Sequence, residues 1–287
     1  MQQYLDMLQE VFVWGDEIEG RNGTTRELFG LQNQYDLASG FPLITTKEMN
    51  TKSILGELIA FIRGYHKIKD FQSLGCNVWN ANANSSYWLD CSFMQQLKKD
   101  NPKAADGELG RIYGVQWRNW TNAAGENTDQ LLEMIEGIKK DPYGRRHIVV
   151  SYNPGELNYM CLPSCHAFFQ VNITKAGKLN LKMYQRSADM FLGVPYNIAS
   201  YAFLMLILCH QTGYIPGNFI HTFGSTHIYK NHYEQVEEQL IRMPYALPQV
   251  SIDPDLSPNC ALEDYKPEHF IIKNYSHEPA IKATMNV

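Results

Sequence analysis

The spacing of apolar residues predicts four helices. Apolar side chains recur at intervals of three and four in residues 3–14, 51–62 and 129–140, which places them on one face of an α-helix. The third stretch ends in Lys139-Lys140 before Asp141-Pro142, and basic residues and proline are both typical of a helix C-terminus. Residues 198–211 are apolar on nearly every face, so we expect this helix to lie buried in the centre of the protein.

Four stretches with strand-like composition lie between and after these helices, at residues 147–152, 167–174, 178–184 and 270–275. Lys175-Ala176-Gly177 joins the second and third as a short hairpin turn. Residues 84–107 are polar and are expected to form a variable surface insertion. Because no repeat or low-complexity linker divides the sequence, we predict a single α+β domain over residues 1–287.

The composition argues against several classes of protein. Hydrophobic residues make up 44% and charged residues 19% of the chain, so it can bury a large core. The 25 Lys and Arg against 30 Asp and Glu give a net charge of −5, which disfavours a broad basic surface for nucleic acid. No secretory signal is visible, and the most apolar run, residues 202–209, is far shorter than the ~20 residues of a membrane span. We expect a cytoplasmic protein with no membrane or nucleic-acid partner.

The six cysteines include one candidate nucleophile. They form no CxxC pair, which favours reduced thiols and a metal-free site over a disulfide framework or a metal cluster. Cys165 stands in Leu162-Pro163-Ser164-Cys165-His166, before a predicted strand, where a nearby cation would lower its pKa toward the thiolate. A lone cysteine at a strand start is also commonly a small buried apolar residue, so both interpretations stay open.

Several arginines lie at the ends of predicted elements. Arg145-Arg146 precede one strand, Arg186-Ser187 follow another, and Arg21 lies in a loop rich in Gly and Thr. Such arginines suit a bidentate grip on phosphate, although solvated surface charge is the simpler account of any single one. Asn197 would lie near the start of the buried helix, where its amide could pair with the planar edge of a ligand or could cap the helix.

Five motifs stand in order along the chain, at residues 41–47, 110–118, 162–166, 185–201 and 224–232. Together they resemble the thymidylate synthase family across essentially the whole sequence. The resemblance implies an α+β fold with a large bent mixed sheet surrounded by helices, and a homodimer formed through the face of that sheet. It also implies a pyrimidine nucleoside monophosphate, dUMP, as substrate and 5,10-methylenetetrahydrofolate as the folate cofactor.

The resemblance assigns roles to individual residues. Cys165 matches the family nucleophile, which adds to C6 of the pyrimidine ring. The positions that match the nucleotide site are Arg21, Arg186 and Ser187 for the phosphate, Arg145 and Arg146 for the phosphate of the opposite subunit's site, Asn197 for the base, His227 and Tyr229 for the sugar 3′-hydroxyl, and Gln185. Those that match proton transfer and the folate site are Glu57, Tyr113, Asp189, Trp79, Asn82, Lys47 and Gly193.

The sequence departs from the family pattern mainly around the folate. Val78-Trp79-Asn80-Ala81-Asn82 stands where the family usually has Ile-Trp-Asp-Glu-Trp, so an indole that would exclude water is lost. Ser225 replaces an Asp or Asn, and Asn286 is polar at a usually small apolar position of the closing tail, residues 284–287. The remaining departures are Arg111 for Pro, Val115 for Lys, and Glu48 and Asn50 for basic residues. These changes predict looser folate binding and a wetter site.

A wetter site changes the expected product. In the family's chemistry, thiolate addition at C6 makes C5 nucleophilic, and the exocyclic methylene formed later takes hydride to give methyl or water to give hydroxymethyl. The departures favour water, with Ser225, Glu57 and Asn82 as candidates to position it, and Asn197 favours uracil over cytosine. We therefore predict a dUMP hydroxymethylase, as used in phage DNA modification; the alternative is a thymidylate synthase that makes dTMP and releases dihydrofolate.

A hypothesis of another class is a regulator that binds its own messenger RNA, or a catalytically silent paralogue. The net charge of −5 argues against strong RNA affinity. The intact set of Cys165, Arg186 and Asn197 argues against loss of catalysis.

Overall fold

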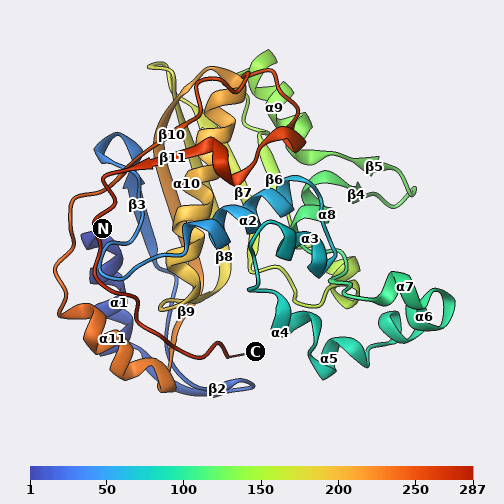
Figure 1. Cartoon of the computed structure of the whole chain (residues 1–287), viewed down its shortest axis with the longest axis horizontal. Helices are drawn as coiled ribbons and strands as arrows, with labels where there is room; N and C mark the ends of the chain where they lie inside the picture. The colour runs from blue at the N-terminus through green and yellow to red at the C-terminus, as the bar shows by residue number, and fades with distance from the viewer. Residues whose placement is uncertain (287) are drawn as a thin grey trace.

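A computed structural model describes residues 1–286 and shows a mixed seven-stranded sheet in the order β1-β2-β9-β8-β7-β6, with β3 also paired to β9 (Figure 1). Its strands are β1 (Asp16–Gly20), β2 (Gly23–Phe29), β3 (Gln32–Asp36), β6 (Ile148–Val150), β7 (His166–Ile173), β8 (Lys178–Asp189) and β9 (Ile215–Tyr229). All the pairings in this sheet are antiparallel except that of β8 with β9. These two strands therefore end at the same edge of the sheet.

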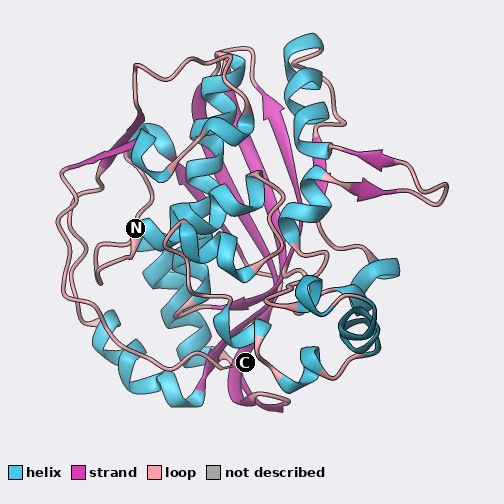
Figure 2. Ribbon diagram, turned by 45° about the vertical axis from the view of Figure 1, so that its right-hand side comes forward, coloured by secondary structure: helices cyan, strands magenta, loops and turns pink. Residues whose placement is uncertain are grey.

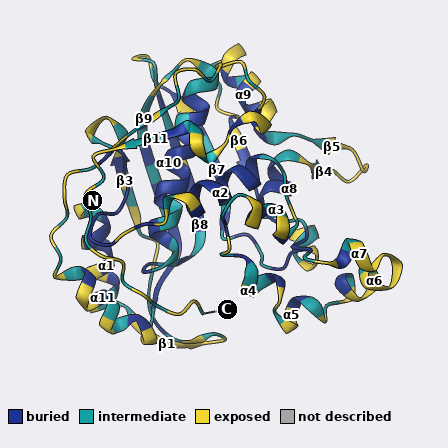
Figure 3. Ribbon diagram, in the orientation of Figure 1, coloured by how far each residue is buried: buried dark blue, intermediate teal, exposed yellow. Residues whose placement is uncertain are grey.

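Helices gather on one face of this sheet (Figure 2). The main ones are α1 (Gln2–Trp14), α2 (Thr51–Ile62), α8 (Tyr113–Arg118), α9 (Gln130–Lys140), α10 (Gly193–Thr212) and α11 (Tyr233–Leu240). Helix α10 crosses from the end of β8 to the start of β9 and packs against both strands and against α2. Its length and hydropathy would allow it to span a membrane, but 72% of its apolar window is buried inside the protein. The darkest, most buried ribbon in Figure 3 includes this helix.

The smaller elements lie at the periphery. They are α3 (Ile68–Ser73), α4 (Asn80–Ala83), α5 (Ser86–Leu89), α6 (Ser92–Asp100), α7 (Pro102–Ala105), the strand pairs β4 (Trp120–Thr121) with β5 (Asn127–Thr128) and β10 (Gln249–Ile252) with β11 (Phe270–Lys273), and five short 3-10 helices: η1 (Leu37–Ser39), η2 (Pro154–Tyr159), η3 (Lys230–His232), η4 (Leu262–Asp264) and η5 (Pro267–His269). Helices α5 to α7 extend from the body of the protein (Figure 1).

The polar stretch at residues 84–107 is helical and anchored. Trp88 is 1% exposed, and its indole N–H donates to the Glu108 carbonyl at 2.7 Å. The Glu108 carboxylate in turn pairs with Lys67 at 2.7 Å and with His66 at 2.8 Å. A buried indole and this group of charges thus fix the segment to the chain that leads into α8.

The four predicted helices are confirmed at the expected positions, and the predicted strands are confirmed in part. Helix α10 starts five residues earlier than expected because Pro195 stands in its first turn, where proline is tolerated. Strand β8 continues to Asp189, beyond the expected end at residue 184. The stretch at 270–275 is a strand, but it pairs with β10 outside the main sheet. The long strand β9 was not predicted, because His221 and Thr226, both polar, occupy its buried positions.

Candidate functional site

Cys165 lies immediately before β7 in a loop that two side chains hold from opposite ends. Its backbone N–H donates to the Tyr113 hydroxyl at 2.7 Å, and Tyr113 is the first residue of α8. The Arg186 guanidinium, on β8, donates to the carbonyls of Ser164 at 3.0 Å and Pro163 at 2.7 Å. The Arg186 N–H also donates to the Cys165 carbonyl at 2.8 Å. The loop therefore has a defined conformation before any ligand binds.

The surroundings of the Cys165 thiol act on its pKa in opposite directions. Burial raises the pKa, while the Arg186 charge and the hydrogen bond with Tyr113 lower it. Burial is the largest effect, so the resting group is a thiol. A cation beside the sulfur nevertheless stabilises the thiolate once it forms.

A chain of polar side chains leads from β9 to Asn197, the fifth residue of α10. Gln185 on β8 donates from Nε2 to Asn197 Oδ1 and to the Ser187 carbonyl, both at 3.0 Å. The Gln185 Oε1 lies 2.8 Å from His221 Nε2 on β9. Two strands and the helix that connects them therefore fix the position of the Asn197 amide.

His166, directly after Cys165, is a site residue that the sequence analysis did not single out. Burial lowers its pKa to about 4, so its ring is neutral near pH 7. Its Nδ1 is buried and has no hydrogen-bond partner within residues 1–286. Its place in the Pro-Ser-Cys-His motif was the signal that could have identified it.

The parallel register of β8 and β9 brings four predicted residues together in two adjacent pairs: Ser187 with Ser225, and Asp189 with His227. Asp189 Oδ1 accepts the N–H groups of Phe191 at 2.9 Å and Leu192 at 3.1 Å, in the turn before α10. Its other oxygen, Oδ2, accepts no hydrogen bond from the described part of the chain. Burial lowers the pKa of His227, and the nearby Asp189 carboxylate opposes this effect.

Glu57 and Trp79 form a partly buried hydrogen-bonded pair beside Tyr113. The Trp79 indole N–H donates to Glu57 Oε1 at 2.8 Å, and the ring centroids of Trp79 and Tyr113 are 5.9 Å apart. Burial raises the pKa of Glu57 to about 7, although the Trp79 hydrogen bond opposes this. A carboxyl group with such a pKa can both take and give a proton near neutral pH. The same burial raises the pKa of Tyr113 well above its usual value, so this phenol stays protonated.

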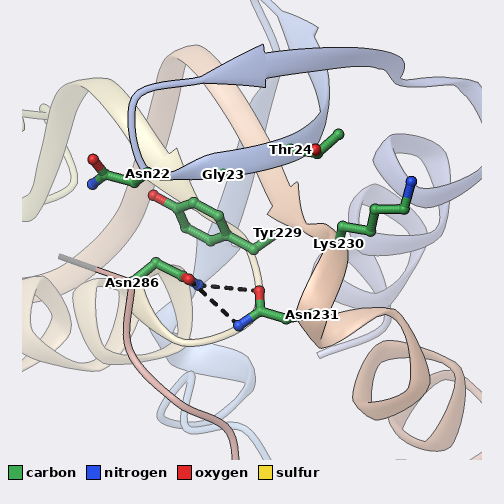
Figure 4. A pocket seen from close by; sticks show the side chains of 7 residues that line it. All are labelled: Asn22, Gly23, Thr24, Tyr229, Lys230, Asn231 and Asn286. Atoms are coloured by element: carbon green, nitrogen blue, oxygen red, sulfur yellow. Dashed lines mark hydrogen bonds between the residues drawn. The ribbon is translucent and has the colours of Figure 1, made fainter.

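A cavity of about 480 Å³ lies beside the turn that carries Arg21. It is lined by Asn22, Gly23, Thr24, Tyr229, Lys230, Asn231 and Asn286 (Figure 4). The predicted sugar ligand Tyr229 forms part of its wall. Asn286 and Asn231 exchange two amide hydrogen bonds, at 3.2 and 3.4 Å, and His232 Nε2 lies 2.8 Å from the Thr284 carbonyl. These contacts hold the C-terminal tail at this cavity; Val287 lies outside the described residues.

Arg145 and Arg146 do not join the other predicted phosphate ligands. Both are exposed and precede β6, where Ile148 pairs with Gln170 and Val150 pairs with Phe168. They therefore lie beyond the Gln170 end of the β6–β7 pair, while Cys165 lies at the opposite end of β7. One chain alone does not bring these arginines to Cys165.

The predicted folate residues are divided between two environments. Lys47 is buried, and its ammonium donates to the Phe191 carbonyl at 2.6 Å and lies 3.7 Å from the centroid of that residue's ring. Burial lowers the pKa of Lys47 to about 7. Gly193 begins α10, close to Asp189, while Asn82 is partly exposed on α4 near Trp79. Lys47 thus supports the turn after Asp189 rather than extending into solvent.

The donors and acceptors of the site suit a planar, hydrogen-bonding ligand. Asp189 Oδ2, which accepts no hydrogen bond from the described residues, can accept from the N–H groups of such a ligand. The described residues contain no group of three or more His, Cys, Asp or Glu side chains placed to hold a metal ion.

Two comparisons with known proteins show the family of this chain. The family model described as "Thymidylate synthase" matches residues 2–287. A thymidylate synthase from Mycoplasma mobile is 44% identical over 297 aligned residues, which cover 100% of this chain and 100% of that protein. Neither comparison points to a hydroxymethylase, and the similarity to a protein named thymidylate synthase favours the methylating alternative.

Proposed function

This chain belongs to the thymidylate synthase family, and from that premise we propose that it methylates dUMP at C5 to give dTMP. The family uses 5,10-methylenetetrahydrofolate, which supplies both the one-carbon unit and the hydride and leaves as dihydrofolate. The observation that carries the proposal is the loop of Cys165, held by Tyr113 on one side and by the Arg186 cation on the other. Such a thiol suits attack on an electron-poor carbon.

In this proposal, each side chain near Cys165 has a separate role in the reaction. The thiol must lose its proton before the sulfur bonds to C6, and the Arg186 charge stabilises the thiolate. Asn197 faces the base, while Tyr113 holds the backbone of the nucleophile in place. Glu57 is the group suited to proton exchange, because its pKa is about 7 whereas that of Tyr113 is raised far above neutrality.

A second subunit completes the phosphate site in this proposal. Arg145 and Arg146 lie too far along the sheet to serve their own chain's Cys165, so a homodimer must supply them. The face of the sheet opposite the helices suits such a dimer, because Ile148 and Phe168 are each 39% exposed there. Mixing inactive Cys165→Ala and Arg146→Ala chains restores activity if the arginine is shared; no recovery after subunit exchange contradicts this.

Hydroxymethylation of dUMP is the second candidate function, favoured by Asn82 and Ser225. Asn82 replaces an indole near Trp79 with a small polar side chain, and Ser225 lies in β9 opposite Ser187. In that reaction dUMP, methylenetetrahydrofolate and water give 5-hydroxymethyl-dUMP and tetrahydrofolate, so no hydride moves. The comparisons support the methylating reaction more strongly.

Mass spectrometry of the nucleotide product separates the two, because the products differ by one oxygen atom. Methylation gives dTMP and one dihydrofolate per turnover, followed by absorbance. A hydroxymethylated nucleotide without dihydrofolate overturns the proposed reaction in favour of the second candidate. Binding of dUMP without either product supports the silent paralogue instead. A cytoplasmic location without nucleic-acid or membrane partners is part of the same proposal.

A further inference from the structure

A buried chain of hydrogen bonds runs from His221 through Gln185 to Asn197. His221 is fully buried between the rings of Phe219 and Phe223, whose centroids lie 5.2 and 3.9 Å from its own. Its Nε2 lies 2.8 Å from Gln185 Oε1, and Gln185 Nε2 lies 3.0 Å from Asn197 Oδ1. His221 contacts neither Cys165 nor the cavity beside Arg21, and the sequence motifs assign it no role.

The Ser187 backbone carbonyl determines which group donates and which accepts in each of these hydrogen bonds. The Ser187 carbonyl can only accept a hydrogen bond, so the group of Gln185 that lies 3.0 Å from it must be the NH₂. The Gln185 oxygen therefore faces His221, which must donate from Nε2. A neutral imidazole carries only one N–H, so Nδ1 is left without a proton. In agreement, burial lowers the His221 pKa well below its usual value, and Nδ1 is buried without a partner within the described residues.

The same direction is passed on to Asn197. The second N–H of Gln185 is donated to Asn197 Oδ1, so the Asn197 NH₂ group points away from Gln185. Asn197 also hydrogen-bonds the His166 ring, and because this contact raises the His166 pKa against the larger effect of burial, it is made by the acceptor Oδ1. The NH₂ group of Asn197 is thus left to donate to a ligand. A pyrimidine with a 4-keto oxygen accepts from this group, whereas a 4-amino group presents a second donor to it.

We propose that Gln185 and His221 are specificity-determining positioning residues, which orient the Asn197 amide so that the site takes 4-keto rather than 4-amino pyrimidine nucleotides. This inference rests on the proposed function, because it takes Asn197 to face the base. It adds that selectivity depends on residues behind Asn197 and not on Asn197 alone.

The test is Gln185→Glu, because a carboxylate can accept but cannot donate. Asn197 must then turn its NH₂ toward residue 185 and present Oδ1 to the base, which suits a 4-amino group. We expect the ratio of dCMP to dUMP affinity, measured by calorimetry, to rise about tenfold or more, as an unmatched buried donor costs at least that much. His221→Phe frees the Gln185 amide to rotate and should raise this affinity ratio by a smaller factor. His221→Gln keeps an N–H donor and should return the ratio toward that of the original protein.

Gln211→Glu is the matched control. Gln211 lies on the same helix as Asn197, fourteen residues later and about 21 Å along the axis, and donates to the Cys260 carbonyl at 2.9 Å. Its variant carries the same change of charge and leaves the ratio unchanged. An unaltered ratio in a folded Gln185→Glu protein, or equal loss of both nucleotides, overturns the inference. The affinity ratio is a binding measurement and is independent of the product assay. Failure of the product assay would overturn the proposed function, whereas an unchanged affinity ratio would overturn this inference.

Discussion

Replacing Glu57 by glutamine tests the environment of the candidate proton-transfer group through the stability of the protein. Burial raises the pKa of Glu57 from an ordinary 4.5 to about 7 in the folded chain. Between these two values the unfolded chain has lost the proton while the folded chain keeps it. Stability therefore falls as the pH rises through this range. At about 1.4 kcal/mol for each pKa unit, the loss is roughly 3 kcal/mol by pH 7.

Glutamine is uncharged at every pH and still offers an oxygen to the Trp79 indole, so the variant escapes this loss. Urea unfolding at fixed protein concentration should show the two proteins nearly equal at pH 4.5 and Glu57→Gln more stable by about 3 kcal/mol near pH 7.5. The same variant should lose activity, because the amide cannot exchange a proton. A stability difference that does not change with pH would refute the reasoning.

Glu108→Gln is the control of opposite sign. Burial raises the pKa of Glu108, but the hydrogen bonds from His66 and Lys67 outweigh it and hold the pKa below its usual value. A lowered carboxyl pKa contributes stability that is present above the unfolded value and is lost as the pH falls. Glu108→Gln should therefore be less stable than the original protein at pH 7, with a deficit that shrinks toward low pH.

Three further substitutions test the nucleophile, the base and the insertion. Cys165→Ser should lower turnover by several orders of magnitude while dUMP binding by calorimetry is retained, because removing a nucleophile acts on the transition state; near-normal activity would exclude the covalent scheme. Asn197→Asp should shift kcat/KM toward dCMP, because an ionised carboxylate accepts from a 4-amino group; unchanged selectivity would show that another residue faces the base. Trp88→Ala should lower the free energy of unfolding by about 3–5 kcal/mol, since it empties a fully buried indole site; a loss under 1 kcal/mol in urea unfolding would show that residues 84–107 are not anchored.

The elements that the sequence predicts are those whose periodicity matches their burial. Helices α1 and α9 each bury a single stripe, so their apolar spacing identifies them. The hydrophobic pattern does not predict strand β9, because two of its buried positions are the polar residues His221 and Thr226, which bond to polar partners. Of the predicted site residues, Arg186 contacts the loop of Cys165, Asn197 accepts from Gln185, and Asp189 lies next to His227 in the sheet; the roles that the motifs imply for them stay predictions.

The contacts that set the chemistry of the site are harder to predict than the identity of its residues. The pairing of Glu57 with Trp79, which lies 22 positions later, depends on how α2 packs against the segment before α4, and no local pattern encodes it. The burial of Lys47 against Phe191 is similarly a result of tertiary packing. The departures at Asn82 and Ser225 led the sequence analysis to predict the hydroxymethyl product, whereas the comparisons favour the methyl product.

The parallel pairing of β8 with β9 has a consequence for the order in which the protein matures. Parallel strands cannot be joined by a tight turn, so these two meet only after the twenty residues of α10 have crossed between them. Such non-local pairing forms late in folding. Arg186, Asn197 and His227 all belong to this crossover unit, and burial in the finished site raises the pKa of the Cys165 thiol. The sulfur of an unfinished chain is therefore the more easily alkylated, and protection of Cys165 from alkylation during refolding would report the final step.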